Sequence, residues 1–234
     1  MTKMRLDRFL SQSSAFSRKE IRFLARTNRI AVDGRCVRDP GEKVEETALV
    51  TVKGKVVPYR KYVYLMLNKP QGYLSAVRDD RDPVVTDLVP EEFKHFQVFP
   101  VGRLDKDTEG LLLLTNDGAF DHALAFPRKE VRKRYFARLD LPAGKEDVEK
   151  FASGMVFPDF TAKSALLEIT ENPCEVFIEI SEGKFHQVKR MCLQAGKTVL
   201  SLKRVAIGGL RLDPALLPGQ CRELTEEEKS LLLS

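Results

Sequence analysis

Residues 102–110, which read GRLDKDTEG, contain the densest group of polar side chains in the sequence. Asp105, Asp107 and Glu109 stand there at alternate positions, between two apolar stretches. Loops held by a rigid scaffold often present catalytic groups, so these residues are candidates for carboxylate chemistry. A calcium-binding loop would require an acidic ligand at its twelfth position, where the sequence has Asn116. A charged surface loop without a function is the remaining alternative.

A second group, EGKFHQVKRM at 182–191, places two adjacent cations in an expected helix over about 184–195. Most Lys–Arg pairs are solvated, but Lys189 and Arg190 stand next to apolar helix positions and can point a cation into a cleft. His186 fits a hydrogen-bonded structural histidine better than a general base. The other two histidines have no paired ligands near them in the sequence, so no metal site is expected.

A third group is the basic run at 128–134, which directly precedes Tyr135. Cations interleaved with an aromatic side chain suit an unstacked nucleobase whose phosphates are held nearby. Considered alone, Tyr135 fits a core or edge-strand tyrosine better. Each of the three groups is a weak indication by itself, so the elements that position them matter.

The chain has 234 residues and a mass of 26.6 kDa, and its positive charge is concentrated at one end. Residues 1–62 contain 15 Lys and Arg against 7 Asp and Glu, whereas the remainder contains 24 against 27. This asymmetry is typical of a nucleic-acid-binding module. The sequence has no apolar run of the roughly 20 residues that a membrane span requires, no signal-peptide core and no CxxC pair among its four cysteines. We therefore expect a cytoplasmic protein with no membrane partner.

The basic module is expected to begin with two helices. Ser17 and Glu20 form a capping-box pattern that predicts a helix over 18–27, and an amphipathic helix is expected over 5–13. A hairpin with an Asp-Gly turn over 30–37 follows. Three arginines recur at i, i+4 and i+8 on the second helix, where they repel one another unless a polyanion binds. These are Arg18, Arg22 and Arg26.

This order of elements within residues 1–60 resembles the RNA-binding module of ribosomal small-subunit protein S-four. The resemblance implies that RNA is the partner and that the second helix and the turn after it contact the RNA. The implied contact residues are Arg18, Lys19, Arg22, Arg26 and Arg29.

The remainder, residues 61–234, is expected to form a larger domain of the α+β class. Consecutive strands over 164–170 and 175–181, with no helix between them, favour a mixed, mainly antiparallel sheet flanked by helices. Further strands are expected over 63–68, 97–101, 111–115, 135–140 and 199–207, and helices over 118–126, 145–153, 184–195 and 225–233.

Four motifs stand in this domain in a characteristic order. They are NKPQGY at 68–73, VGRLDKDTEGLLLLTNDG at 101–118, KRYFARLD at 133–140 and EGKFHQVKRM at 182–191. Together they closely resemble the RsuA branch of the ribosomal RNA pseudouridine synthases. In the fold that this implies, the active cleft runs across the sheet, and no metal and no organic cofactor are used.

The resemblance also implies roles for individual residues. Asp105 corresponds to the catalytic aspartate, Tyr135 to the tyrosine that packs on the flipped uracil, and Lys189 to the basic residue that pairs with the aspartate. Arg103 corresponds to the arginine that helps to displace the target base, and Arg190 is a further candidate for RNA binding.

The implied function is isomerisation of a uridine in 16S ribosomal RNA to pseudouridine. The product has the same mass as the substrate and needs no group donor, so a single carboxylate can suffice, as a nucleophile or as a base on the ribose. Two alternatives stay open: the same reaction on 23S ribosomal RNA, and a non-catalytic RNA-binding assembly factor. The expected partner is ribosomal RNA or an assembling small-subunit particle, and the chain is expected to be a monomer.

Overall fold

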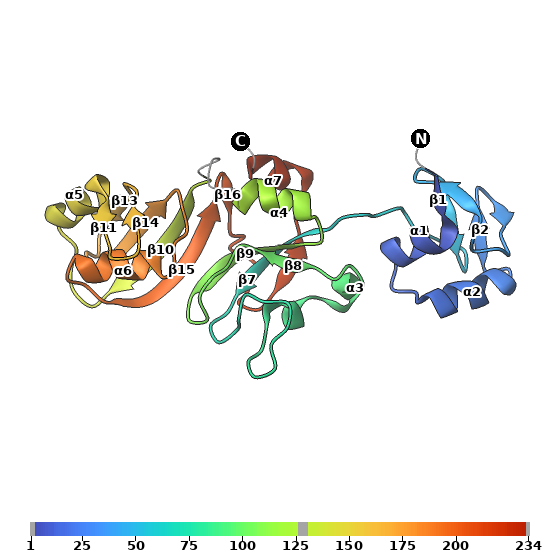
Figure 1. The fold of residues 1–234 in the computed structure, drawn as a ribbon, viewed down its shortest axis with the longest axis horizontal. Coiled ribbons are helices and arrows are strands. Elements are labelled where there is room, and N and C mark those ends of the chain that lie inside the picture. Colours follow the sequence, from blue (N-terminus) through green and yellow to red (C-terminus); the bar gives the residue numbers. More distant parts are fainter. Residues whose placement is uncertain (1–2, 126–130, 233–234) are drawn as a thin grey trace. The chain divides into compact units, whose positions relative to one another are not determined.

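The computed structural model describes residues 3–125 and 131–232, and these residues form two compact units (Figure 1). One unit comprises the chain up to Val63 together with Val89–Val98. The other comprises Tyr64–Leu88 and the chain from Phe99 onward. The domain boundary expected at residue 60 lies close to this division and stays a prediction.

The first unit combines three helices with two small sheets. Both expected helices and the expected hairpin are present, and the Ser17–Glu20 capping box that starts the second helix has both of its hydrogen bonds. Apolar side chains such as Phe9, Ile21 and Ile30 are fully buried between the helices and the strands, so this unit has its own core. The elements are β1 (Lys3–Arg5), α1 (Leu6–Ser13), α2 (Arg18–Arg26), β2 (Ile30–Val32), β3 (Arg35–Cys36), β4 (Lys43–Glu45), β5 (Val50–Val52), β6 (Lys55–Val56) and α3 (Glu91–Lys94).

The second unit is built on one large sheet. Its strands include β7 (Tyr64–Lys69), β8 (Phe99–Val101), β9 (Glu109–Thr115), β10 (Lys133–Leu139), β13 (Leu166–Ile169), β14 (Glu175–Ile180), β15 (Val199–Ile207), β16 (Leu210–Arg211) and β17 (Cys221–Glu223). The strand order is β13-β14-β10-β15-β9-β7-β17, with β16 beside β15 and β8 beside β9. Within the described chain, β9 and β15 form the one parallel pair of this sheet. The predicted α+β class with a mixed, mainly antiparallel sheet is confirmed.

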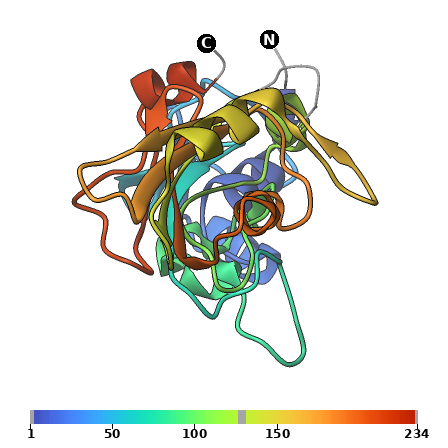
Figure 2. The ribbon, with the colours of Figure 1, turned by 90° about the vertical axis from the view of Figure 1, so that its left-hand side faces the viewer.

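Helices and short strands complete the second unit. The helices α5 and α6 pack against β13 and β15, and α6 is seen end-on in Figure 2. The helices α4 and α7 pack against β8 and β16. The elements are η1 (Val85–Leu88), α4 (Gly118–Ala125), α5 (Lys145–Ser153), the hairpin of β11 (Met155–Val156) and β12 (Thr161–Ala162), α6 (Gln187–Gln194) and α7 (Glu226–Leu231). In the described residues no helix is long and apolar enough to cross a bilayer.

The helix expected from residue 184 begins later than predicted, at Gln187. His186, which precedes it, has the left-handed backbone angles φ 51° and ψ 29°, and an α-helix cannot continue through that conformation. The ends of the helices expected at 126 and 233, and residues 128–130 of the basic run, lie outside the described residues. The short strands β1, β16 and β17 have two or three residues each and show no alternation long enough to predict them.

Candidate active site

Asp105 lies in the loop over residues 102–108, which connects β8 to β9. Gly102 opens the loop with a φ of 67°, a conformation that a residue with a Cβ rarely adopts. Two residues later the loop is fixed by Ser75, whose hydroxyl accepts the Leu104 N–H at 3.0 Å and donates to the Leu104 carbonyl at 2.8 Å. Leu104 itself is buried. The backbone directly before Asp105 is thereby held in one place.

Lys69, at the end of β7, holds the loop from inside. Its side chain is fully buried, and its Nζ donates to the carbonyl oxygens of Pro70, Asp105, Lys106 and Thr108 at 3.1, 3.0, 3.3 and 2.9 Å. Burial lowers the pKa of this ammonium to about 8. Because three of these carbonyls belong to the loop, Lys69 is the group around which the loop folds.

A second lysine contacts the carboxylates themselves. Lys189 on α6 places its Nζ 3.0 Å from Asp105 Oδ2 and 2.5 Å from Asp107 Oδ1. Burial opposes the charge of Lys189, but the hydrogen bonds to Asp107 and Asp105 outweigh burial and raise its pKa. The same ammonium holds the pKa of Asp107 below its ordinary range. Residues 84 positions apart along the chain are therefore joined in one charge cluster.

The turn before α6 brings further groups to Asp105. Gln187 is buried and accepts the backbone N–H of Lys184 at 2.9 Å, which closes the turn. His186, at the left-handed position, points its Nε2 to 3.6 Å from Asp105 Oδ1. The exposed ring of Phe185 stacks on the His186 ring with centroids 3.8 Å apart. The strained backbone at His186 is thus what directs its imidazole to the carboxylate.

A small cavity of about 70 Å³ lies beside this cluster. Asp105 and Tyr135 both line it, and Tyr135 is only 7% exposed on β10. Thr108 also lines it, with a buried hydroxyl that has no hydrogen-bond partner among the described residues.

The two arginines proposed near the site lie in different surroundings. Arg103 is exposed and lines the cavity, and it forms no ion pair with another described residue. Arg190 does not line the cavity. Its guanidinium bonds to both carboxylate oxygens of Asp159, at 2.9 and 2.5 Å, and lies over the rings of Phe157 and Phe160. The structure therefore brings Arg103 to Asp105 but engages Arg190 with the β11–β12 hairpin.

Sequence reasoning placed Asp107 among the candidate carboxylates but did not identify Lys69 and Ser75 as parts of this arrangement. Lys69 carries one usable signal, since it is a lysine that directly follows the apolar strand YLMLN without a turn residue. A serine in an irregular segment has no comparable signal. The five basic residues that the resemblance to protein S-four implies as RNA contacts all lie in the first unit and are exposed.

Comparison with known proteins identifies the family to which this chain belongs. The model of the RNA pseudouridylate synthase family matches residues 63–194, and that of the S4 domain matches residues 4–50. The chain belongs to the RNA pseudouridylate synthase family. The predicted RNA pseudouridine synthase activity, an isomerase activity, and the predicted RNA-binding domain in front of it are thereby confirmed.

Relatives of this pseudouridylate synthase match it over nearly the whole chain. It is 45% identical to the uncharacterized RNA pseudouridine synthase YtzG of Bacillus subtilis (strain 168), over 98% of each chain. It is 40% identical to the ribosomal small subunit pseudouridine synthase A of Escherichia coli (strain K12), over 96% of this chain and 98% of the relative. A crystal structure of a pseudouridylate synthase superposes with a TM-score of 0.69 at 30% identity, over 98% and 99% of the two chains.

The activity of this pseudouridylate synthase is expected to fall as the pH rises through about 8, where Lys69 loses its proton. A neutral amine donates only two hydrogen bonds, whereas four carbonyl oxygens face this nitrogen, so the loop that bears Asp105 loosens. A rate profile against pH, with RNA substrate in excess, measures the effect. A rate that stays constant up to the ordinary lysine pKa of 10.5 would contradict it.

The contribution of Lys69 to the free energy of unfolding should change with pH in the direction opposite to the activity. Because its pKa is lowered from 10.5 to about 8, the unfolded chain binds more protons than the folded chain between these two values. The contribution of Lys69 to the free energy of unfolding therefore rises with pH in that window. Melting temperatures measured beside the rates distinguish local loosening of the loop from unfolding.

Proposed function

We propose that this enzyme converts a uridine of 16S ribosomal RNA into pseudouridine, with Asp105 as the catalytic carboxylate. The observation that carries the proposal is the position of Asp105: its carboxylate lines a cavity whose wall includes Tyr135, and Lys189 donates to it at 3.0 Å. The relative from Escherichia coli, named a ribosomal small subunit pseudouridine synthase, supports small-subunit RNA as the substrate. Such a substrate requires a cytoplasmic location.

The chemistry needs little besides a placed carboxylate. The bond between ribose C1′ and uracil N1 breaks, the ring turns, and uracil C5 bonds to the same C1′. The proton leaves C5 and N1 gains one, so atoms balance without a cofactor. Asp105 can serve as a nucleophile toward the ribose or the ring, or as a base that removes a ribose proton. The Lys189 ammonium offsets the negative charge of the Asp105 carboxylate before and after these steps.

The target nucleotide must leave its stack before Asp105 can reach it. Extrusion costs a few kcal/mol, and stacking on an aromatic side chain returns about 1–3 kcal/mol per base. We assign the stacking surface to Tyr135, which is next to the carboxylate in the cavity wall. Arg103 is exposed at the cavity and has no ion-pair partner in the part of the chain that the structure describes, and it would fill the space that the extruded base leaves in the RNA.

The S4 domain supplies binding that does not depend on the reaction. Its second helix, α2, presents basic side chains that form no ion pair with another described residue. Neutralising a phosphate with such a side chain releases a condensed counterion. The residues to which we assign RNA contacts are Arg18, Lys19, Arg22, Arg26 and Arg29.

The Arg22→Ala/Arg26→Ala variant is expected to bind ribosomal RNA more weakly and with less dependence on salt. Loss of two phosphate contacts should reduce the slope of log K against log salt by about 1–2. The matched control is Arg5→Ala/Arg35→Ala, because each of these arginines already pairs with a carboxylate of its own domain. If the two variants show equal salt slopes, α2 is not the RNA-binding surface.

The substrate is tested by carbodiimide primer-extension mapping of 16S and 23S ribosomal RNA from cells with and without this gene. We expect one pseudouridine stop to disappear from 16S RNA in the deletion strain. The wild-type gene should restore the stop and the Asp105→Asn gene should not. A stop lost from 23S RNA instead would transfer the proposal to the large subunit, and an unchanged pattern in both RNAs would refute it.

A further inference from the structure

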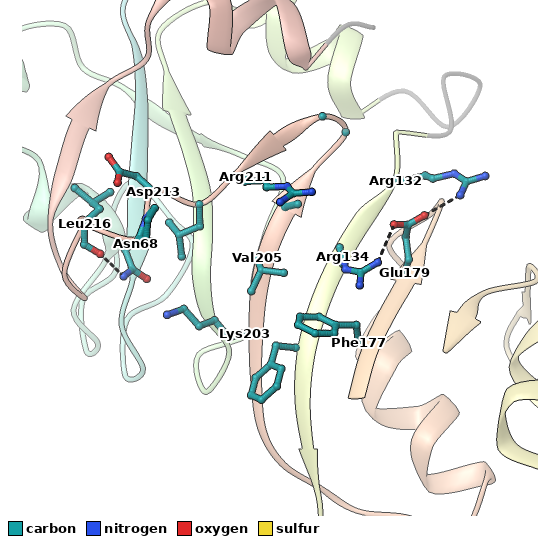
Figure 3. A pocket seen from close by; sticks show the side chains of 16 residues that line it. Asn68, Arg132, Arg134, Phe177, Glu179, Lys203, Val205, Arg211, Asp213 and Leu216 are labelled. Carbon is teal, nitrogen blue, oxygen red and sulfur yellow. Dashed lines mark hydrogen bonds and ion pairs between the residues drawn. The ribbon is translucent and has the colours of Figure 1, made fainter. Parts of the chain in front are cut away.

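The sheet of the catalytic unit has a second hollow on its other face. This groove, of about 840 Å³, is lined by Arg134 and Phe136 of β10, whereas Tyr135 between them lines the Asp105 cavity. Successive side chains of a strand point to opposite faces of the sheet. The same alternation places Lys203 in the groove and Leu202 at the cavity. The groove, shown in Figure 3, is therefore separate from the site proposed for catalysis.

The groove is positively charged. Its two carboxylates already have cationic partners: Glu179 pairs with Arg132 at 2.8 Å, and Asp213 pairs with Arg222 at 2.7 Å. Two lining cations, Lys203 on β15 and Arg211 on β16, form no ion pair with a described residue. An anionic group in the groove would find both of them available.

An aromatic surface lies beside these cations (Figure 3). The rings of Phe136 and Phe177, on neighbouring strands, have centroids 5.5 Å apart and are both half-buried in the groove wall. The guanidinium of Arg134 lies 4.6 Å from the Phe177 ring centroid. Planar groups stack well on such a combination of phenyl rings and a guanidinium.

We propose that this groove binds a nucleotide, with its phosphate on Lys203 and Arg211 and its base on the phenyl rings. Lys203 lies directly opposite Phe136 on the neighbouring strand, and neither feature belongs to the Asp105 cavity. The nucleotide can be a free one or one residue of an RNA strand, since both present the same chemistry.

Adenosine 5′-monophosphate is the probe of choice, because it carries both a phosphate and a large planar base, and the small Asp105 cavity does not suit a purine. The ¹⁵N-labelled full chain is titrated with it at low salt, and the amide shifts of β10 and β15 are followed. We expect saturable shifts at the groove with a dissociation constant of about 1 mM. The Asp105→Asn variant should bind equally well, so failure of the catalytic proposal leaves this result unaffected.

The test variant is Lys203→Glu/Arg211→Glu, with Lys203→Gln/Arg211→Gln as a second variant that introduces no new charge. Both are expected to weaken binding at least about tenfold. The control, Lys145→Glu/Lys150→Glu on α5, changes the net charge equally outside the groove and should bind as the wild type does. Wild-type affinity in both groove variants would overturn the proposal, as would shifts confined to the Asp105 cavity.

Two further ligands test whether the base contributes to binding and whether the bound nucleotide is free or part of an RNA strand. Inorganic phosphate that binds as tightly as the nucleotide would overturn the proposal, because the base would then contribute nothing. Tetraadenylate that binds at least about tenfold more tightly than the mononucleotide, in the wild type but not in the groove variants, identifies an RNA strand as the occupant. Equal affinities identify a free nucleotide.

Discussion

Asp105→Asn is expected to reduce pseudouridine formation by about 10³-fold or more while the protein stays folded and binds RNA. Asparagine has nearly the same shape and its Oδ1 can still accept a hydrogen bond from Lys189, which bonds to Asp105 at 3.0 Å in the wild type. The substitution removes the charge and the basicity of the carboxylate. Formation of the C5–C1′ bond expels the C5 hydrogen, so release of tritium from RNA labelled at uracil C5 measures the reaction in a single turnover.

Asp107→Asn is the matched control, because Asp107 lies on the same loop and bonds to the same lysine at 2.5 Å. Its side chain is 71% exposed and does not line the cavity, so we expect a loss of only about tenfold, which reflects a less constrained Lys189. If Asp107→Asn were the inactive variant and Asp105→Asn the active one, the assignment of the carboxylate would be wrong.

Lys69→Met is expected to have the second largest effect, a fall of about 10²-fold in the rate of the chemical step. Methionine fills most of the space but donates no hydrogen bond, so the carbonyls of Asp105, Lys106 and Thr108 lose their shared donor. Unsatisfied buried carbonyls should lower the free energy of unfolding by about 1–3 kcal/mol. Single-turnover rates and urea denaturation measure the two effects separately.

Lys106→Met on the same loop tests whether this effect is specific. The Lys106 ammonium is half-exposed and pairs with Asp82 at 2.6 Å, an interaction that contributes at most about 1 kcal/mol at a surface. We expect its rate to stay within about threefold of the wild type. A Lys69→Met enzyme as fast as Lys106→Met would show that the buried ammonium does not position the loop.

Local signals in the sequence predict the elements well. The capping box at Ser17 and Glu20 correctly starts α2, and the strands over 164–170 and 175–181 pair antiparallel as expected. Both predictions rest on interactions between residues close in the chain. The start of α6 differs because the left-handed backbone at His186 is stabilised by contacts that sequence periodicity does not describe.

The site depends on contacts between distant segments, which explains what sequence patterns miss. The family resemblance predicted that Lys189 pairs with Asp105, which lies 84 positions earlier in the chain. Hydrophobic periodicity could not predict this contact, because it relates only residues that are close in the sequence. Lys69 resembles an ordinary strand-end lysine until its four carbonyl partners are seen. Arg190 directly follows Lys189, yet one step along the helix turns it to Asp159.

The most direct test of the central claim is a crystal structure of the Asp105→Asn variant bound to a 16S RNA fragment that contains the target uridine. We predict that this uridine is extruded, with its uracil in van der Waals contact with the Tyr135 ring and its ribose beside the residue 105 side chain. A uridine still stacked in the RNA, with side chain 105 facing open solvent away from any nucleotide, would contradict the account.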